Sequence, residues 1–354
     1  MSNTLKNILI IKPSSLGDIV LALPALTALH KGFPEAKISW LIRPEFAPLL
    51  KNHPYLTDVI AFDRKFLGKA WHNRRALVSL LSLIRRLRRS KFDIAIDLQG
   101  LFRTASLAWL SGCRERFGMA NARELAHIFY THKVPNNQDC IHVVDYYLKI
   151  IKTAGAFEAQ PQFVLPTDSA AVDSANRLLA SYRINPCEYA VLVPGSAHKS
   201  KCWPAYNFAS LAEKMASKFG ISIIAVGTRP ERPTIEKIAS AAGVPVANFA
   251  GLTSLPELVA LFKTARIVVS NDTGPGHIAA AVGVPLVMIF GPSNPIRLLP
   301  YRRPETLAAV DPFGRGLKLQ SSDPDHAIEA ITVDDVYQKV CGQIEQKPLQ
   351  SYNI

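Results

Sequence analysis

Short apolar runs alternate along this chain with segments whose apolar residues recur at helical spacing. In the first half the runs are NILIIK (7–12), KISWLI (37–42) and FDIAIDLQG (92–100), and helical patterns follow from near Ile19, within 64–91 and from Arg103. Near-continuous apolar strands joined by helices are typical of a parallel sheet covered on both faces. The pattern predicts a first α/β domain over residues 1–165.

The same alternation restarts in the second half. A helical pattern at 168–183 is followed by the apolar runs YAVLVPG (189–195), ISIIAVG (221–227), RIVVSND (266–272) and PLVMIFG (285–291), and a last helix is expected over 331–345. We therefore predict a second doubly wound domain over 166–354. Two such domains in one chain predict a cleft between them, onto which the carboxyl ends of both sets of strands face.

Composition agrees with a folded chain of about two domains. The 354 residues are 48% hydrophobic, which is enough to build more than one core. The five cysteines form no CxxC pair and no zinc-ligand spacing, which favours a reducing, cytoplasmic compartment. Neither a secretory leader nor an apolar run near the ~20 residues of a membrane span is visible, so we expect any membrane contact to be peripheral.

The basic charge is concentrated in the first half. The net charge is +13, and residues 1–165 hold 23 Lys and Arg against 12 Asp and Glu, whereas the remainder holds 18 against 16. Such a field attracts an anionic partner. The segment 64–91 has ten basic residues, no acidic one and apolar residues at helical spacing. It is either a solvated helix face or a surface for an anionic acceptor, a membrane headgroup or a nucleic acid.

A glycine-rich turn between a buried strand and a small-residue helix is the strongest local signal. In RIVVSNDTGPGHIAAAVGVPLVMIFGP (266–292), Gly274 and Gly276 would let the backbone approach a diphosphate, and the free N–H groups of the helix start form an anion site. No GK[ST] ending of a Walker loop is present. In the structural alternative Asp272 is a cap and the glycines serve packing, and His277 is either a phosphate donor or an ordinary first-turn residue.

Two further strand ends carry polar residues. The turn VLVPGSAHKSKCWP (191–204) contains Ser196, Lys199 and Lys201. These side chains could neutralise the charge of a departing pyrophosphate, or the turn is simply a solvated loop. Glu231 lies beyond the next strand, where a carboxylate can accept hydrogen bonds from ribose hydroxyls.

The turn after the first strand differs because it contains an acid. Ser15 to Asp18 fits the capping-box pattern [ST]-x-x-[DE], which is a structural role. A carboxylate repels phosphate, so a functional Asp18 would instead be a base, ionised at a helix start and facing an acceptor. No metal-ligand cluster, GxSxG or HExxH motif occurs, and the single Asp-Thr-Gly lacks the second copy that an aspartic protease needs.

Taken together, these motifs resemble those of the bacterial lipopolysaccharide heptosyltransferases, glycosyltransferase family 9. The resemblance covers nearly the whole chain, through ILIIKPSSLGDIVLALPAL, FDIAIDLQGLFRTASLA, RFGMANARELAHIFY, PGSAHKSKCWP and SNDTGPGHIAAAVGVPLVMIFGPSNP. It is strongest for the members that add the first heptose to Kdo-lipid A. The resemblance implies a GT-B fold, an acceptor-binding first domain, a second domain for the nucleotide sugar ADP-heptose, and inverting transfer without a metal.

The resemblance also implies roles for individual residues. Asp18 matches the catalytic base, and Lys201 the lysine that meets the leaving diphosphate. The remaining donor positions are Asp272, Thr273, Gly274 and His277 for the diphosphate, Glu231 for the ribose, Thr253 for a backbone contact to the base, and Ser196. The first-heptose enzymes have two adjacent threonines where this chain has Ser196 and Ala197, so one hydroxyl contact is lost. The acceptor is an anionic glycolipid, and its candidate partners are Arg64, Lys65, Lys69 and Arg123.

Several alternatives remain open from the sequence alone. The family motifs do not separate the first heptose from a later heptose or another NDP-sugar. A protein of a different class, one that binds nucleic acid or another anionic polymer, would also explain the basic segment but not the strand-end loops of the second domain. The reading we favour expects no nucleic acid and places the protein peripherally on the cytoplasmic face of the inner membrane.

Overall fold

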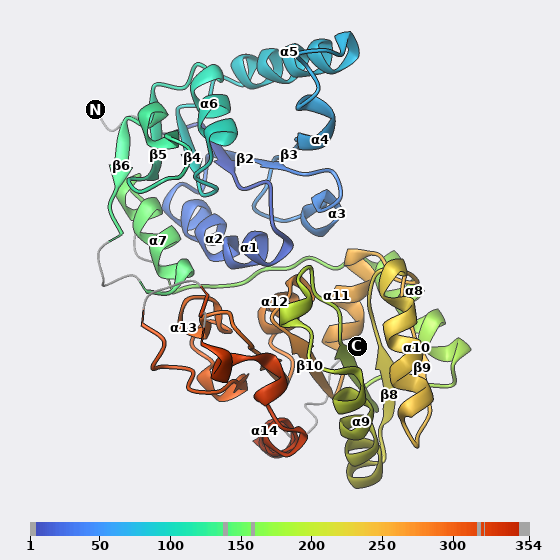
Figure 1. Cartoon of the computed structure of the whole chain (residues 1–354). Helices are drawn as coiled ribbons and strands as arrows, with labels where there is room; N and C mark the ends of the chain where they lie inside the picture. Colours follow the sequence, from blue (N-terminus) through green and yellow to red (C-terminus); the bar gives the residue numbers. More distant parts are fainter. Residues whose placement is uncertain (1–4, 137–140, 157–159, 317–319, 322, 347–354) are drawn as a thin grey trace. The chain divides into compact units, whose positions relative to one another are not determined.

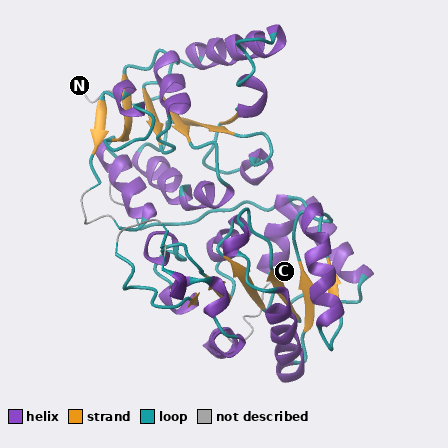
Figure 2. Cartoon of the chain, in the orientation of Figure 1, coloured by secondary structure: helices purple, strands orange, loops and turns teal. Residues whose placement is uncertain are grey.

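The chain divides into two compact units, Met1–Pro166 (unit 1) and Thr167–Ile354 (unit 2) (Figures 1 and 2). The computed structural model describes residues 5–136, 141–156, 160–316, 320–321 and 323–346. The pattern of apolar runs had predicted a division after residue 165.

Unit 1 is built on a six-stranded parallel sheet. Its strands are β1 (Asn7–Ile11), β2 (Lys37–Ile42), β3 (Asp58–Ala61), β4 (Ile94–Asp97), β5 (Glu115–Met119) and β6 (His132–Val134), in the order β3-β2-β1-β4-β5-β6. The connecting helices are α1 (Leu16–Leu21), α2 (Leu23–Gly32), α3 (Ala47–Leu50), α4 (Arg64–Leu67), α5 (Arg74–Arg89), α6 (Phe102–Leu110), the 3-10 turn η1 (Ala126–Phe129) and α7 (Val143–Thr153). Strands β1 and β4 are almost wholly buried, as their apolar runs predict.

Helices cover both faces of this sheet. On one face Leu83 and Leu87 of α5 and Leu107 of α6 pack on Leu9 and Ile11 of β1. On the other face α1, α2 and α7 lie together (Figure 1). A parallel sheet covered in this way excludes water from its centre, which leaves the strand ends for polar side chains.

Unit 2 repeats the architecture. Its strands are β7 (Tyr189–Val193), β8 (Ser222–Ala225), β9 (Val246–Asn248), β10 (Ile267–Asn271), β11 (Leu286–Ile289) and β12 (Leu307–Ala308), in the parallel order β12-β11-β10-β7-β8-β9. Its helices are α8 (Ser169–Ser181), α9 (Ala205–Phe219), α10 (Arg232–Ala241), α11 (Leu255–Lys263), α12 (Gly274–Val282), α13 (Pro295–Leu298) and α14 (Val333–Gln346). Residues of α9, α10 and α14 form one core with the sheet, and α11 packs against α8 and α12.

Both sheets have the strand order of a Rossmann fold. Counted within each unit, the order is 3-2-1-4-5-6, so the order in which strands are added reverses between β1 and β4 and again between β7 and β10. Ligands of open α/β sheets bind at the carboxyl ends of such a switch point. The predicted pair of Rossmann-like domains is confirmed, and the sequence-predicted turns after β1, β7 and β10 all lie at switch points.

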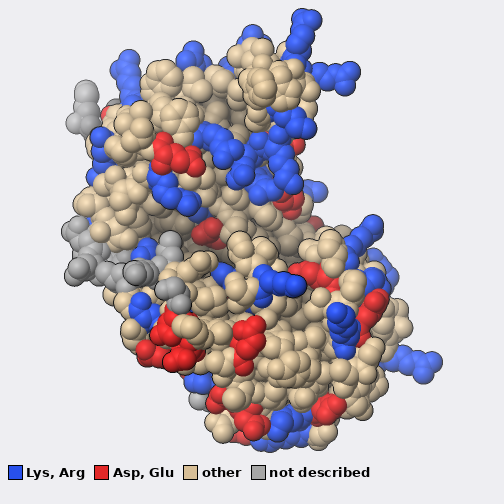
Figure 3. Space-filling view, viewed as in Figure 1, with Lys and Arg blue, Asp and Glu red and all other residues tan. Residues whose placement is uncertain are grey.

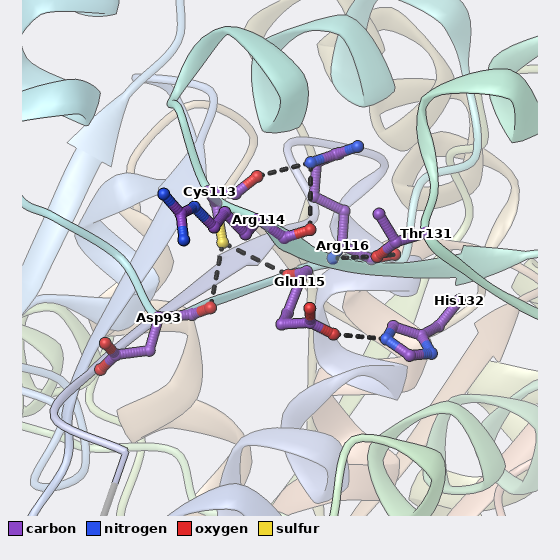
Figure 4. Close-up of polar contacts among 7 residues, drawn as sticks. All are labelled: Asp93, Cys113, Arg114, Glu115, Arg116, Thr131 and His132. Atoms are coloured by element: carbon purple, nitrogen blue, oxygen red, sulfur yellow. Dashed lines mark hydrogen bonds and ion pairs between the residues drawn. The ribbon is translucent and has the colours of Figure 1, made fainter. Parts of the chain in front are cut away.

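The edge of the first sheet is held by polar contacts around β5 (Figure 4). Arg116 donates from Nε to the Phe129 carbonyl and from Nη1 to the Cys113 carbonyl, both at 2.6 Å. Its backbone N–H donates to Thr131 Oγ1 at 2.8 Å. The bonds to Phe129 and Thr131 fasten the segment that leads into the short strand β6 to β5, which supplies stability that three residues of strand cannot provide by themselves.

Other expectations concern membrane spans and thiols. Within the described ranges, no helix has the length and apolar character that crossing a membrane requires. Cys113, Cys187, Cys202 and Cys341 are free thiols, and Cys140 lies outside the described residues.

Gly118 of β5 offers a test of the packing in unit 1. A Cβ atom at this position would overlap the ring of Tyr130, which is 4% exposed. We expect Gly118→Ala to lower the free energy of unfolding by about 1–3 kcal/mol through overpacking, measured by urea denaturation. Gly342→Ala in α14, where a Cβ atom meets nothing within 4 Å, is the control and should leave stability equal or slightly higher.

Candidate active site

The carboxylate of Asp18 lies at the carboxyl end of β1, at the first switch point. Ser15 is the N-cap of α1, and Asp18 is the third residue of that helix. Asp18 Oδ2 accepts hydrogen bonds from the Ser15 N–H at 3.0 Å and from its hydroxyl at 2.8 Å. The side chain is nevertheless one third exposed. The capping role predicted from the sequence therefore holds the carboxylate in place while leaving part of it open.

A buried lysine stands behind this carboxylate. Lys12 follows β1 directly and is 3% exposed, with Nζ 3.9 Å from Asp18 Oδ1 and 5.4 Å from the ring centre of Tyr147. Burial by itself would lower the pKa of Lys12, but nearby Asp18, Tyr147 and Asp97 raise it. The lysine is thus a fixed positive charge, which favours the ionised form of Asp18.

A second buried network braces the same turn from β4. Asp97 accepts hydrogen bonds from the hydroxyls of Tyr130 and Thr104 at 2.7 and 2.8 Å, and from the N–H of Gln99 at 2.8 Å. Gln99 Oε1 in turn accepts from the Ser14 N–H at 3.3 Å. Burial raises the pKa of Asp97, although these bonds oppose the shift. The two strand ends on either side of the switch point are therefore tied together.

In unit 2 the structure brings together three of the predicted residues. Lys201, in the turn after β7, places Nζ 2.6 Å from Asp272 Oδ2. His277, in the first turn of α12, places Nε2 3.6 Å from Asp272 Oδ1. Asp272 and His277 are each 5% exposed, and His277 Nδ1 is buried with no hydrogen-bond partner in the described part of the chain.

Asp272 is an ionised acid that lies between a lysine and a histidine. Burial would raise its pKa, but His277 and Lys201 lower it well below its usual range. A carboxylate at this place neutralises its neighbours rather than meeting a phosphate itself. Its position at the end of β10 explains how Lys201 and His277, 76 positions apart in the sequence, come to the same spot.

Asn271 fixes the loop that carries Lys201. The sequence alone did not predict this role. Its side chain is fully buried, donates to the Pro194 carbonyl at 2.7 Å and accepts from the Trp203 N–H at 3.2 Å. The Trp203 indole donates to the Ile331 carbonyl at 2.8 Å. A polar residue at the end of an apolar strand was the available signal, and the same signal marks Lys12 and Asp97 in unit 1.

Glu231 lies where two glycines make room for it. A Cβ atom at Gly195, after β7, would overlap its carboxylate, and one at Gly227, after β8, would come within 2.9 Å. Glu231 Oε2 also accepts from the Thr228 N–H and hydroxyl at 2.5 and 2.8 Å. A pocket of about 520 Å³ in unit 2 is lined by Gly195, Ser196 and Glu231, together with Pro194, Lys199, Ser200, Cys202, Trp203, Pro204, Ala205, Pro230, Thr234 and Glu329. Ser196 and Glu231 are thus brought to one cavity.

The turn before α12 has the predicted form. Thr273 is the N-cap and Gly274 the first helical residue, so free backbone N–H groups lie at this helix start. Gly276 has a structural reason of its own, because a Cβ atom there would approach Ser270 Oγ to 2.7 Å and Met288 Cε to 3.1 Å. Of the two readings of the glycines, packing accounts for Gly276.

The remaining predicted residues lie on separate loops. Thr253 precedes α11, in a turn that the Gly251 N–H fastens to the Gly227 carbonyl at 2.8 Å. Arg64, Lys65 and Lys69 are exposed on α4 and the turn that follows it, and Arg123 is exposed in the loop after β5. Among the described residues, no group of three or more His, Cys, Asp or Glu side chains could hold a metal ion. That the protein needs no metal remains a prediction.

With this geometry in place, comparison with known proteins decides the family. The profile of glycosyltransferase family 9 (heptosyltransferase) matches residues 80–323. The chain belongs to glycosyltransferase family 9. It is therefore a glycosyltransferase, which answers the question of enzyme against binding protein that the basic segment left open.

Curated relatives align over most of the chain. The lipopolysaccharide core heptosyltransferase OpsX of Haemophilus influenzae is 26% identical and covers 86% of this chain and 84% of its own. Lipopolysaccharide heptosyltransferase 1 of Pseudomonas aeruginosa is 30% identical over 81% of this chain and 79% of its own. Lipopolysaccharide heptosyltransferase 3 of Escherichia coli K12 is 24% identical over 80% and 82%. The relatives thus include enzymes named heptosyltransferase 1 and heptosyltransferase 3.

Solved structures of this family have the same fold. The family 9 glycosyltransferase of Veillonella parvula superposes with a TM-score of 0.84, at 22% identity, over 98% of this chain and 99% of its own. The E. coli heptosyltransferase WaaC, solved with ADP, gives a TM-score of 0.75 at 25% identity over 95% and 99%. The GT-B class predicted from the motifs is confirmed.

The buried cluster in unit 2 generates a prediction about stability and pH. Asp272→Asn leaves the Lys201 ammonium without its counter-charge, and breaking a buried pair from one side costs about 3–5 kcal/mol. Folding lowers the pKa of Asp272. Its contribution to the free energy of unfolding is therefore present at neutral pH and is lost as the pH falls below about 4, the ordinary Asp pKa. Urea denaturation should show the largest difference from wild type near pH 7.

A double variant separates the charge from the shape of the side chains. Asp272→Asn combined with Lys201→Met removes both members of the pair and should be less destabilised than Asp272→Asn alone. Equal stability of the single and double variants would show that the ion pair is not what holds this strand end.

Proposed function

We propose that this protein is a lipopolysaccharide heptosyltransferase that moves a heptose from ADP-heptose to the Kdo and inner-core region. The observation that carries the proposal is the cluster of Lys201, Asp272 and His277 at the start of α12, in a chain of family 9. The names of the curated relatives support the heptose and the lipopolysaccharide acceptor, and the ADP bound to WaaC supports the nucleotide.

For the step, we propose addition of the first heptose. The relatives OpsX and heptosyltransferase 1 support this choice, and the heptosyltransferase 3 relative supports the alternative of a later heptose. The presence of Ser196 and Ala197 in place of two threonines keeps another NDP-sugar as a further alternative.

In the donor site, positive charge meets the diphosphate as it departs. Lys201, His277 and the N–H groups at the start of α12 supply that charge in a largely buried place, where electrostatic interactions are strong. His277 Nδ1, which has no hydrogen-bond partner among the described residues, is proposed to meet a ligand oxygen. Glu231 accepts from the ribose hydroxyls, Ser196 lies in the same pocket, and the Thr253 backbone meets the base. We propose that these groups make a metal unnecessary.

In the acceptor site, Asp18 is the general base. It takes the proton of an acceptor hydroxyl as that oxygen forms a bond to the anomeric carbon, while the bond from this carbon to the diphosphate breaks and ADP leaves. Because attack comes from the face opposite ADP, the configuration inverts. Lys12 keeps Asp18 ionised and Ser15 fixes its orientation, both of which a base requires.

The acceptor itself explains the exposed cations of unit 1. Kdo carries a carboxylate and lipid A carries phosphates, so Arg64, Lys65, Lys69 and Arg123 are proposed to bind these groups. The acceptor is a lipid, and we therefore propose that the protein works peripherally at the cytoplasmic face of the inner membrane.

Incubation with defined donors and acceptors tests the proposed reaction. ADP-heptose and a set of UDP-sugars are each combined with Kdo-lipid A or with an already heptosylated acceptor, and the products are identified by mass. We expect one heptose on Kdo-lipid A from ADP-heptose. Product from the heptosylated acceptor alone would assign a later step, and transfer from a UDP-sugar alone would contradict the donor.

Asp18→Asn tests the base. The variant should fold and bind ADP as the wild type does, yet lose about 100-fold or more in kcat, because a general base contributes on that order. Asp168→Asn is the matched control, since Asp168 caps α8 in unit 2 through the Ala171 N–H at 2.7 Å. Undiminished transfer by the Asp18 variant would remove it as the base.

Charge reversal tests the acceptor contacts. With detergent-dispersed acceptor, changing Arg64, Lys65 and Lys69 to Glu should raise the KM for acceptor at least tenfold and spare the KM for donor, because the opposite charge repels the glycolipid. The control changes Arg177, Lys237 and Lys339 of unit 2 to Glu. An equal rise in both KM values would speak against this assignment.

A further inference from the structure

Helix α5 and the turn before it expose large apolar side chains to solvent. Trp71 is 86% exposed, Val78 63%, Leu81 43% and Leu77 42%. Single exposed apolar residues are common on proteins, whereas a group within eleven positions of the chain marks an interaction surface.

The exposed apolar residues lie away from the buried side of α5. Ala76, Leu83 and Leu87 are buried, and the two leucines belong to the core of unit 1. At 100° per residue, Leu77 and Leu81 lie on one flank of the helix, and Val78 lies on its far side with Arg74 and Arg85. The exposed side of α5 therefore carries aliphatic side chains and arginines together. We call this exposed side, with Leu77, Val78 and Leu81, the outer face.

Unneutralised cations surround the outer face. Arg74, Arg75, Arg85 and Arg89 are exposed, and within the described ranges none of them has an acidic partner. By contrast, Arg86 on the flank of α5 is paired with Asp58 at 2.7 Å. Residues 64–91 contain no acidic residue that could pair with these arginines. Figure 3 shows Lys and Arg side chains gathered over the part of unit 1 that carries α4 and α5.

This combination matches the surface of an anionic bilayer. An interfacial helix lays aliphatic residues among the acyl chains, keeps Trp at the headgroup level and meets lipid phosphates with Arg. A nucleic acid would use the cations but gives no reason for three exposed aliphatic residues. The core of a protein interface is depleted of charge, whereas here four arginines lie beside the apolar residues.

We propose that the outer face of α5, with Trp71, docks unit 1 on anionic phospholipid headgroups. The inference deepens the proposed peripheral location, on which it rests, by assigning the surface that meets the membrane, and it holds whichever sugar is transferred. It differs also from the acceptor contacts on α4, since it needs no Kdo or lipid A in the membrane.

Flotation with vesicles tests the inference without any substrate. The full-length protein should float with vesicles of phosphatidylcholine and phosphatidylglycerol, and remain unbound with phosphatidylcholine alone. Changing Leu77, Val78 and Leu81 to Gln should reduce binding to the anionic vesicles at least tenfold, and so should changing Arg74, Arg75, Arg85 and Arg89 to Gln, since each basic residue contributes near an anionic surface. Trp71→Ser, outside the helix, should weaken binding without any effect on helix formation.

Matched controls in unit 2 separate the surface from general effects. Gln at Val172, Tyr182 and Phe313 removes three exposed apolar side chains, and Gln at Arg177, Arg183, Lys237 and Lys339 removes the same charge as the arginine variant. Both controls should float as the wild type does, and all variants should transfer sugar to detergent-dispersed acceptor at the wild-type rate. Wild-type flotation by both outer-face variants, absence of binding by the wild type, or association of the outer face with a protein instead would overturn the proposal.

Discussion

Parallel strands covered on both faces impose the constraint on which this molecule depends. The middle of such a strand has no water and accepts only apolar side chains, so charged residues near the core must lie where the strands end. The buried polar residues at the two switch points follow this rule. Lys12 follows β1, Asp97 ends β4, and Asn271 and Asp272 end and follow β10.

The two switch points use opposite signs of charge. In unit 1 the carboxylate of Asp18 is part-exposed, and the cation of Lys12 is buried behind it. In unit 2 Lys201 is the more accessible partner, and the carboxylate of Asp272 is buried behind it. In each case the accessible group faces a buried group of opposite charge. The first arrangement suits a group that takes a proton and the second a group that meets a negative leaving group.

The apolar runs predicted seven interior strands and missed β5 and the four edge strands, for a physical reason. Runs such as NILII and IVVSN are apolar because both of their faces are buried. By contrast ERFGM of β5, HKV of β6 and VAN of β9 contain exposed or half-buried positions, so they exist as strands because a neighbour supplies hydrogen bonds. Local pattern does not contain that information.

The same limit applies to the candidate site. The turns that hold Asp18, Lys201 and His277 were found because an apolar strand stops at a polar or glycine-rich turn. Asp272 contacts Lys201 only because β7 and β10 are neighbours in the sheet. The order of strands in a sheet is not contained in the local sequence pattern. The roles of Asn271, Gln99 and Tyr130 arise in the same way, since each connects segments that are distant in the sequence.

The uneven distribution of charge follows from where the cations act. In unit 2 one lysine and one histidine lie beside a carboxylate in a buried place, where water screens little and few charges are enough. In unit 1 the cations of α4 and α5 are exposed, so salt and water weaken each of them to a small contribution. A large anionic partner can be held under those conditions only by many such contacts. This difference in screening accounts for a surplus of basic residues in unit 1 and near-balance in unit 2.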